Sequence, residues 1–95
     1  MDGDTADLPR LLDIRDRYGV WLLVDEAHSL GVLGKTGRGL AEHQGVDAGR
    51  IYLVVGTLSK SLATCGGYVC AKKSIIDYFR FTLPGFVYSV GLSPV

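Results

Sequence analysis

The segment "RIYLVVGTLSKSLATCGGYVCA", residues 50–71, contains two apolar stretches joined by a short link of small and hydroxylic residues. We expect strands over residues 50–57 and 66–71, because such continuous apolar runs are typical of strands covered on both faces. A link this tight favours an antiparallel return between the two strands. Between Arg50 and Lys72 the only charged residue is Lys60, which lies in the link. This isolation suggests a chemical role for the lysine.

Upstream, the sequence predicts a helix followed at once by another strand. In "DLPRLLDIRDRYG", residues 7–19, Asp7 is a plausible N-cap, Pro9 lies in the first turn and Gly19 suits a left-handed C-cap. The expected buried stripe of this helix consists of four apolar residues: Leu8, Leu11, Leu12 and Ile14. The run "VWLLVDE", residues 20–26, predicts a buried strand that ends in two carboxylates.

A glycine-rich stretch, residues 28–49, predicts a long loop with one helical turn near residues 40–43. Residues 72–83 predict a helix that ends before Pro84, and "FVYSV", residues 86–90, a further strand. The inward side of that helix is expected to carry Ile75, Ile76, Phe79 and Leu83. Alternating helices and strands predict an α/β fold with a mainly parallel sheet, in one domain.

Charge and composition exclude several functions. The 95 residues include ten basic and ten acidic ones without a block of like charge, which does not favour nucleic acid or an anionic membrane as a partner. No apolar run is long enough to span a membrane, and the acidic start lacks a signal-peptide pattern, so we expect a cytoplasmic protein. Cys65 and Cys70 lack the spacing of a metal or redox motif. We expect them to be buried thiols, and we expect no metal site.

Five residues at or just beyond the carboxyl ends of the predicted strands match the needs of pyridoxal phosphate. Lys60 offers an amine for Schiff-base formation, and Asp25 a carboxylate for the ring nitrogen. His28 is a donor for the phenolic oxygen, and Thr57 and Ser59 carry hydroxyls for the phosphate. Each has a simpler interpretation: a surface lysine, a carboxylate that caps the next turn, a loop histidine, and hydroxyls that bond locally.

Two segments in this order, "VDEAHSLGVLGKTGRG" (24–39) and "GTLSKSLATCGGYV" (56–69), resemble the α-oxoamine synthase family of fold-type I pyridoxal phosphate enzymes. The flanks, residues 1–29 and 86–94, are also similar to that family. The two segments look nearest to bacterial serine palmitoyltransferases, with 8-amino-7-oxononanoate synthases as neighbours. The resemblance implies that residues 1–95 are part of the large, cofactor-binding domain of a longer enzyme, and that this piece alone is inactive.

The resemblance also implies a reaction and a role for each residue. The family condenses an amino acid with an acyl thioester, carried on coenzyme A or a carrier protein, usually with decarboxylation, to give an α-amino ketone. Lys60 is then the residue of the internal aldimine, Asp25 the partner of the pyridinium nitrogen, and His28 the donor to the phenolic oxygen. Thr57 and Ser59 contact the phosphate. The family's active site lies at a homodimer interface, where Ser89 of the other subunit is the candidate for a further phosphate contact.

Three other interpretations remain open at this point. "VDEAH" also spells the acidic motif of DEAH-type ATPases, in which Asp25 holds magnesium, although the phosphate loop that such enzymes need upstream is absent from this sequence. Some relatives of the synthases are non-catalytic partner subunits that have lost the lysine, which Lys60 argues against. The third interpretation is an α/β module without a site.

Overall fold

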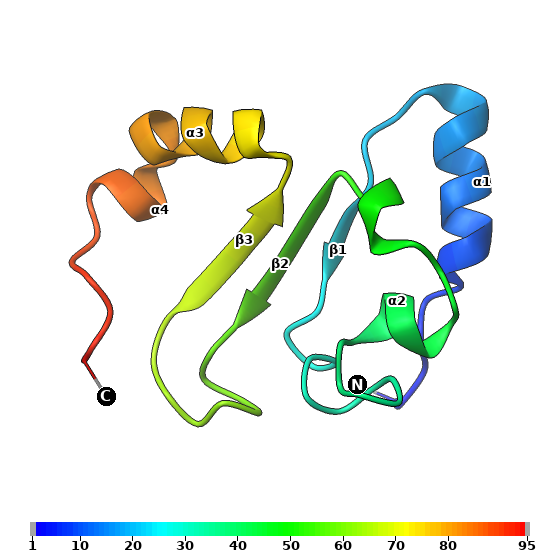
Figure 1. Cartoon of the computed structure of the whole chain (residues 1–95), viewed down its shortest axis with the longest axis horizontal. Coiled ribbons are helices and arrows are strands. Elements are labelled where there is room, and N and C mark those ends of the chain that lie inside the picture. Colours follow the sequence, from blue (N-terminus) through cyan, green and yellow to red (C-terminus); the bar gives the residue numbers. More distant parts are fainter. Residues whose placement is uncertain (1, 95) are drawn as a thin grey trace.

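The computed structural model describes residues 2–94 and has a three-stranded sheet at its centre (Figure 1). The strands are β1 (Leu23–Asp25), β2 (Leu53–Thr57) and β3 (Gly67–Ala71), in the order β1-β2-β3. β1 and β2 are parallel, and β2 and β3 are antiparallel. The α/β class and the antiparallel return are confirmed. The described residues form a small mixed sheet, with one parallel and one antiparallel strand pair. β1 and β2 are also shorter than expected.

Helix α1 (Leu8–Tyr18) forms where its end signals predict it. The Asp7 carboxylate accepts the backbone N–H of Arg10 at 3.1 Å, and Gly19 ends the helix in the left-handed region with φ 64°. Of the predicted stripe, Leu8 and Leu12 are fully buried, whereas Ile14 is 43% exposed. Residues four apart share a helix face, but a residue six positions after Leu8 points elsewhere, which explains why Ile14 leaves the stripe.

The core lies where α1 and the short helix α2 (Leu40–His43) meet β1. Its fully or nearly fully buried members are Leu8, Leu12, Val24, Leu40, Ala41 and Ile51. The predicted helical turn at residues 40–43 is thus confirmed as α2, and a 3-10 turn, η1 (Ala48–Arg50), leads into β2. The Gln44 side chain joins the two helices: it accepts the N–H of Leu8 at 2.9 Å and donates to the carbonyl of Ala6 at 2.7 Å.

The strands are less covered than the sequence predicts. Val24 is the one buried residue of β1, and every residue of β2 is half-buried. Cys65 and Cys70 are both exposed, so the prediction of buried thiols is wrong. Helix α3 (Lys73–Thr82) has no buried residue. The four residues predicted on its inward side are only half-buried: Ile75, Ile76, Phe79 and Leu83. Within residues 2–94, the helices cover too little of the sheet to bury both of its faces.

The predicted strand over residues 86–90 is wrong. Pro84–Val87 form one helical turn, α4, and the segment from Tyr88 to Pro94 has no regular structure. Proline suits the first position of a helix because its φ is fixed near the helical value and its missing N–H needs no partner there. The Leu83 carbonyl accepts the N–H groups of Phe86 and Val87, both at 2.9 Å. Among the described residues, no helix is long and apolar enough to cross a membrane.

Candidate active site

Asp25 and Thr57 are the last residues of the neighbouring parallel strands β1 and β2. Asp25 pairs with Val55 in the parallel register, and the next N–H, of Glu26, donates to the Val55 carbonyl at 2.8 Å. Since parallel strands end at the same side, the residues that follow β1 and β2 face a common region. The Asp25 side chain is exposed, and its Oδ1 accepts the N–H of Ala27 at 2.8 Å. Asp25 therefore caps the next turn, while its Oδ2 has no hydrogen-bond donor within residues 2–94.

His28 lies close to Asp25 in space as well as in sequence. Both side chains line a cavity of about 590 Å³, whose apolar wall includes Leu8, Leu11 and Leu33. Thr57 and Lys60 are not part of this lining. The structure therefore groups the residues of the first motif around one cavity and leaves those of the second motif at the neighbouring strand end.

Thr57 organises the link that carries Lys60. Its Oγ1 donates to the Gly66 carbonyl at 3.1 Å, lies 2.8 Å from the Ser59 Oγ and accepts the Ser59 N–H at 3.2 Å. The link is closed further by the N–H of Leu58, which also donates to Gly66. Lys60 is exposed, and no carboxylate in the described part of the chain pairs with it. The two hydroxyls and the amine thus come together on one short, closed link.

Ser89 is separate from the other candidates in this single chain. It follows α4 in the irregular C-terminal segment, is exposed, and donates its hydroxyl to the carbonyl of Val90 at 3.2 Å. Its predicted role belongs to the active site of a second subunit and stays a prediction.

Glu26 is a residue whose role sequence reasoning missed. It is only 4% exposed, and its carboxylate accepts the Leu40 N–H, at 3.1 and 3.0 Å from the two oxygens, and the Ser29 hydroxyl. Successive residues of a strand point to opposite faces, so an exposed Asp25 places Glu26 toward the interior. That alternation was the signal available in the sequence. Glu26 joins the end of β1 to the start of α2.

Tyr68 lies beside these carboxylates. Burial raises the pKa of its phenol, and the negative charges of Cys70, Glu26 and Asp25 raise it further. Its ring also lies against Gly56 of β2, at a place where any Cβ would collide with the phenol oxygen. A side chain at the glycine that begins the "GTLSK" motif would therefore have to displace this ring.

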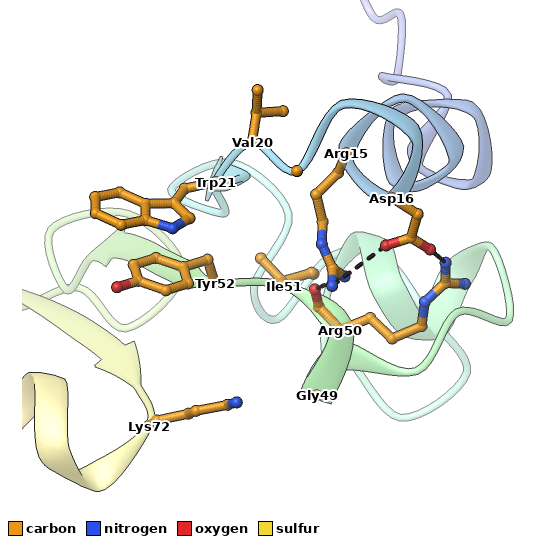
Figure 2. A pocket seen from close by; sticks show the side chains of 10 residues that line it. Arg15, Asp16, Val20, Trp21, Gly49, Arg50, Ile51, Tyr52 and Lys72 are labelled. Atoms are coloured by element: carbon orange, nitrogen blue, oxygen red, sulfur yellow. Dashed lines mark hydrogen bonds and ion pairs between the residues drawn. The ribbon is translucent and has the colours of Figure 1, made fainter.

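Figure 2 shows a second pocket, which contains none of the predicted site residues. The rings of Trp21 and Tyr52 stack there with centroids 4.8 Å apart, and Arg50 forms an ion pair with Asp16. Trp21 and Tyr52 precede β1 and β2, so this pocket lies at the amino ends of these strands, whereas Asp25 and Thr57 lie at their carboxyl ends. The candidate site and this pocket are separate features.

The family described as aminotransferase class I and II matches residues 1–95. The chain belongs to this family. The resemblance to α-oxoamine synthases is confirmed by relatives within it: a protein of Trichormus variabilis named for 8-amino-7-oxononanoate synthase is 51% identical over 99% of this chain. Serine palmitoyltransferase 2 of Dictyostelium discoideum is 45% identical over all of it. The chain spans 24% of the first relative and 19% of the second.

Solved structures of the same two enzymes share the fold. Serine palmitoyltransferase of Sphingomonas wittichii is 37% identical, with a TM-score of 0.86 over 97% of this chain and 23% of that one. The 8-amino-7-oxononanoate synthase of Francisella tularensis is 32% identical, with a TM-score of 0.78 over 97% of this chain and 27% of that one. A further match, 38% identical with a TM-score of 0.84, is serine palmitoyltransferase with pyridoxal phosphate bound as the internal aldimine; it covers 95% of this chain and 22% of that one. These matches favour the synthase interpretation over the ATPase.

Proposed function

We propose that the protein carrying this chain is a pyridoxal phosphate-dependent acyltransferase. It condenses an amino acid with an acyl thioester, on coenzyme A or a carrier protein, with decarboxylation, to an α-amino ketone. The observation that carries the proposal is the placement of both motifs at the carboxyl ends of two adjacent parallel strands, with Asp25 as the last residue of β1 and the Lys60 link after β2. Family membership and the two kinds of relative support it.

The residues present fit this cofactor chemically. The exposed Lys60 amine has no carboxylate partner within residues 2–94, so it is available to an aldehyde. One oxygen of Asp25 orders the following turn, and the other is left for the pyridinium nitrogen. Thr57 and Ser59 carry two hydroxyls 2.8 Å apart, and each can rotate its proton from its present acceptor, the Gly66 carbonyl or the other hydroxyl, toward a phosphate oxygen.

Each side chain then has a distinct task. The bound cofactor supplies an electron sink for the carbanion at the amino acid's α-carbon. The Asp25 carboxylate would favour a positive charge on the ring nitrogen by Coulomb attraction, and His28, which lines the same cavity, would hydrogen-bond the phenolic oxygen. The free Lys60 amine would accept the proton from the α-carbon of the amino acid.

The assembly and location are also proposals. We propose a homodimer in which Ser89 of one subunit contacts the phosphate held by the other, since Ser89 follows α4 and lies on an exposed segment. A cytoplasmic location also stays a proposal.

Borohydride trapping tests the function directly. In the complete protein, we expect pyridoxal phosphate to give a visible absorption band and, after reduction, a peptide carrying the cofactor at Lys60. Lys60→Ala removes the amine, so it should bind the cofactor without covalent fixation. Lys35→Ala, which removes an exposed lysine from the loop after β1, is the matched control and should be labelled like the wild type. Absence of any uptake by the wild type would refute the proposal.

A further inference from the structure

The loop between β1 and α2 meets the lysine link at Gly31. A Cβ built on Gly31, which has φ +78°, would lie 2.9 Å from the Cβ of Ser61 and 3.1 Å from its Oγ. Non-bonded carbon atoms attract best at about 3.5–4.0 Å and repel at shorter distances. The backbone of Gly31 is therefore seated so closely against the residue after Lys60 that a side chain does not fit.

The Gly31 side of this contact is held in place. Gly31 donates its N–H to the Gly37 carbonyl at 2.8 Å, and Leu30 pairs with Arg38 in an antiparallel bridge. We call residues 30–39 the glycine loop. Its end is tied to β1 because the N–H of Leu40, the next residue, donates to the buried Glu26 carboxylate. Moving Gly31 away from Ser61 would disturb these bonds.

The Ser61 side has little freedom either. A Cβ is fixed to its backbone, so no rotation of the serine side chain removes the 2.9 Å contact. The turn that contains Ser61 is closed by the Ala63 N–H, which donates to the Lys60 carbonyl at 3.0 Å, and Ala63 has a positive φ of 50°. A shift of Ser61 therefore shifts the backbone of Lys60.

We propose that Gly31 is a positioning residue for Lys60. Its missing side chain lets the glycine loop seat against Ser61 and so fixes the lysine turn relative to Asp25 and His28, which precede the loop on the same strand end. The inference rests on the proposed function for the role of Lys60, but the contact itself is a property of the fold. It joins the two motifs, which are far apart in the sequence, at one point.

A four-variant set in the complete protein tests the contact. Gly31→Ala introduces the clash, Ser61→Gly removes its partner atoms, and the double variant combines both. Gly45→Ala is the matched control, because Gly45 also has a positive φ, +66°, but no atom within 4 Å of a built Cβ. Two quantities are measured: the dissociation constant for pyridoxal phosphate by absorption titration, and amide hydrogen exchange over residues 60–64.

We expect Gly31→Ala to weaken cofactor binding about tenfold or more and to speed exchange over residues 60–64, as overpacking does in a region that has no room to relax. Adding Ser61→Gly should recover most of both effects, while Gly45→Ala should stay within about threefold of the wild type. The proposal would be overturned if Gly31→Ala bound pyridoxal phosphate as tightly as the wild type. It would also be overturned if the double variant bound the cofactor no better than Gly31→Ala. If the wild type itself binds no pyridoxal phosphate, the proposed function fails, and hydrogen exchange alone decides the contact by the same comparison.

Discussion

Glu42 is a second carboxylate that holds the glycine loop. Its carboxylate accepts the N–H and hydroxyl of Thr36, at 3.1 and 2.7 Å, and the N–H of Arg38 at 3.0 Å. The Thr36 hydroxyl, followed by the Arg38 N–H, lowers the pKa of Glu42 below its ordinary value of 4.5. Each of these bonds favours the ionised form, so the loop is held best when Glu42 is charged.

This predicts acid sensitivity of the loop. A lowered folded-state pKa means that Glu42 stabilises the folded loop above pH 4.5 and that this contribution is lost as the pH falls through the folded-state pKa. The protection factors of the Thr36 and Arg38 amides should therefore fall as the pH is lowered below 4.5 and through the folded-state pKa of Glu42. In Glu42→Gln the fall should be absent, since the amide keeps an acceptor but does not titrate in this range. Equal acid sensitivity in both proteins would contradict the assignment.

Glu26 shows what a buried acceptor contributes at the same scale. Removing the Glu26 carboxylate leaves two buried donors, the Leu40 N–H and the Ser29 hydroxyl, without an acceptor. Each buried donor left unpaired costs about 1–3 kcal/mol of stability. Glu26→Ala should thus lower the stability of the complete protein more than Glu42→Ala, whose partners are exposed. Thermal unfolding of the two variants gives the comparison, and a larger loss in Glu42→Ala would argue against it.

At the scale of single elements, α1 is a helix whose start depends on one side chain. Asp7 accepts the Arg10 N–H, and replacing such a cap by alanine typically costs about 1 kcal/mol. We expect Asp7→Ala to speed amide exchange in the first turn of α1 roughly fivefold, and Asp13→Ala, an exposed change within the same helix, to alter that turn much less. Equal effects of both substitutions would show that the cap does not hold the helix start.

The elements that the sequence predicts well are those with local signals. Asp7 and Gly19 mark the ends of α1 by capping, and the Gly66–Gly67 pair marks the start of β3, so both elements lie close to where they were expected. Residues 86–90 offer no capping or turn signal, only their apolar character, and a short apolar run suits a strand and a helical turn equally well. The predicted end of a helix before Pro84 is confirmed by α3, and Pro84 also begins a second helix, α4, which is not among the elements predicted from the sequence.

Contacts between distant segments were beyond local reasoning. The sequence predicts Asp25, His28, Thr57 and Lys60 at or just beyond strand ends, because strand ends are visible in the sequence. The approach of Gly31 to Ser61 and the bonds from Glu26 to Leu40 depend on how two loops pack, and no local pattern encodes that. Exposure of Cys65 and Cys70 was missed for a similar reason: an apolar neighbourhood in the sequence does not say whether a helix covers it.

At the scale of the whole molecule, the sheet is open on both sides. β1 and β3 each pair only with β2 within residues 2–94, so each presents an edge without a strand partner. Large apolar side chains are exposed as well, among them Trp21 at 77% and Phe81 at 83%. The chain spans about a quarter of the length of the relatives it matches first.

The chain produced alone should therefore self-associate. Unpaired strand edges and exposed apolar patches join copies of a protein, and we expect sedimentation velocity at about 100 µM to show dimers or larger species. Cys70→Lys places a charge on the edge strand β3 and should reduce this association, because a buried lysine is costly where two edges meet. Cys65→Lys adds the same charge on the exposed link outside the strand and should change it little. A wild-type chain that stays monomeric would contradict the argument from open edges. If both substitutions reduce the association equally, the added charge and not its place on β3 is the cause.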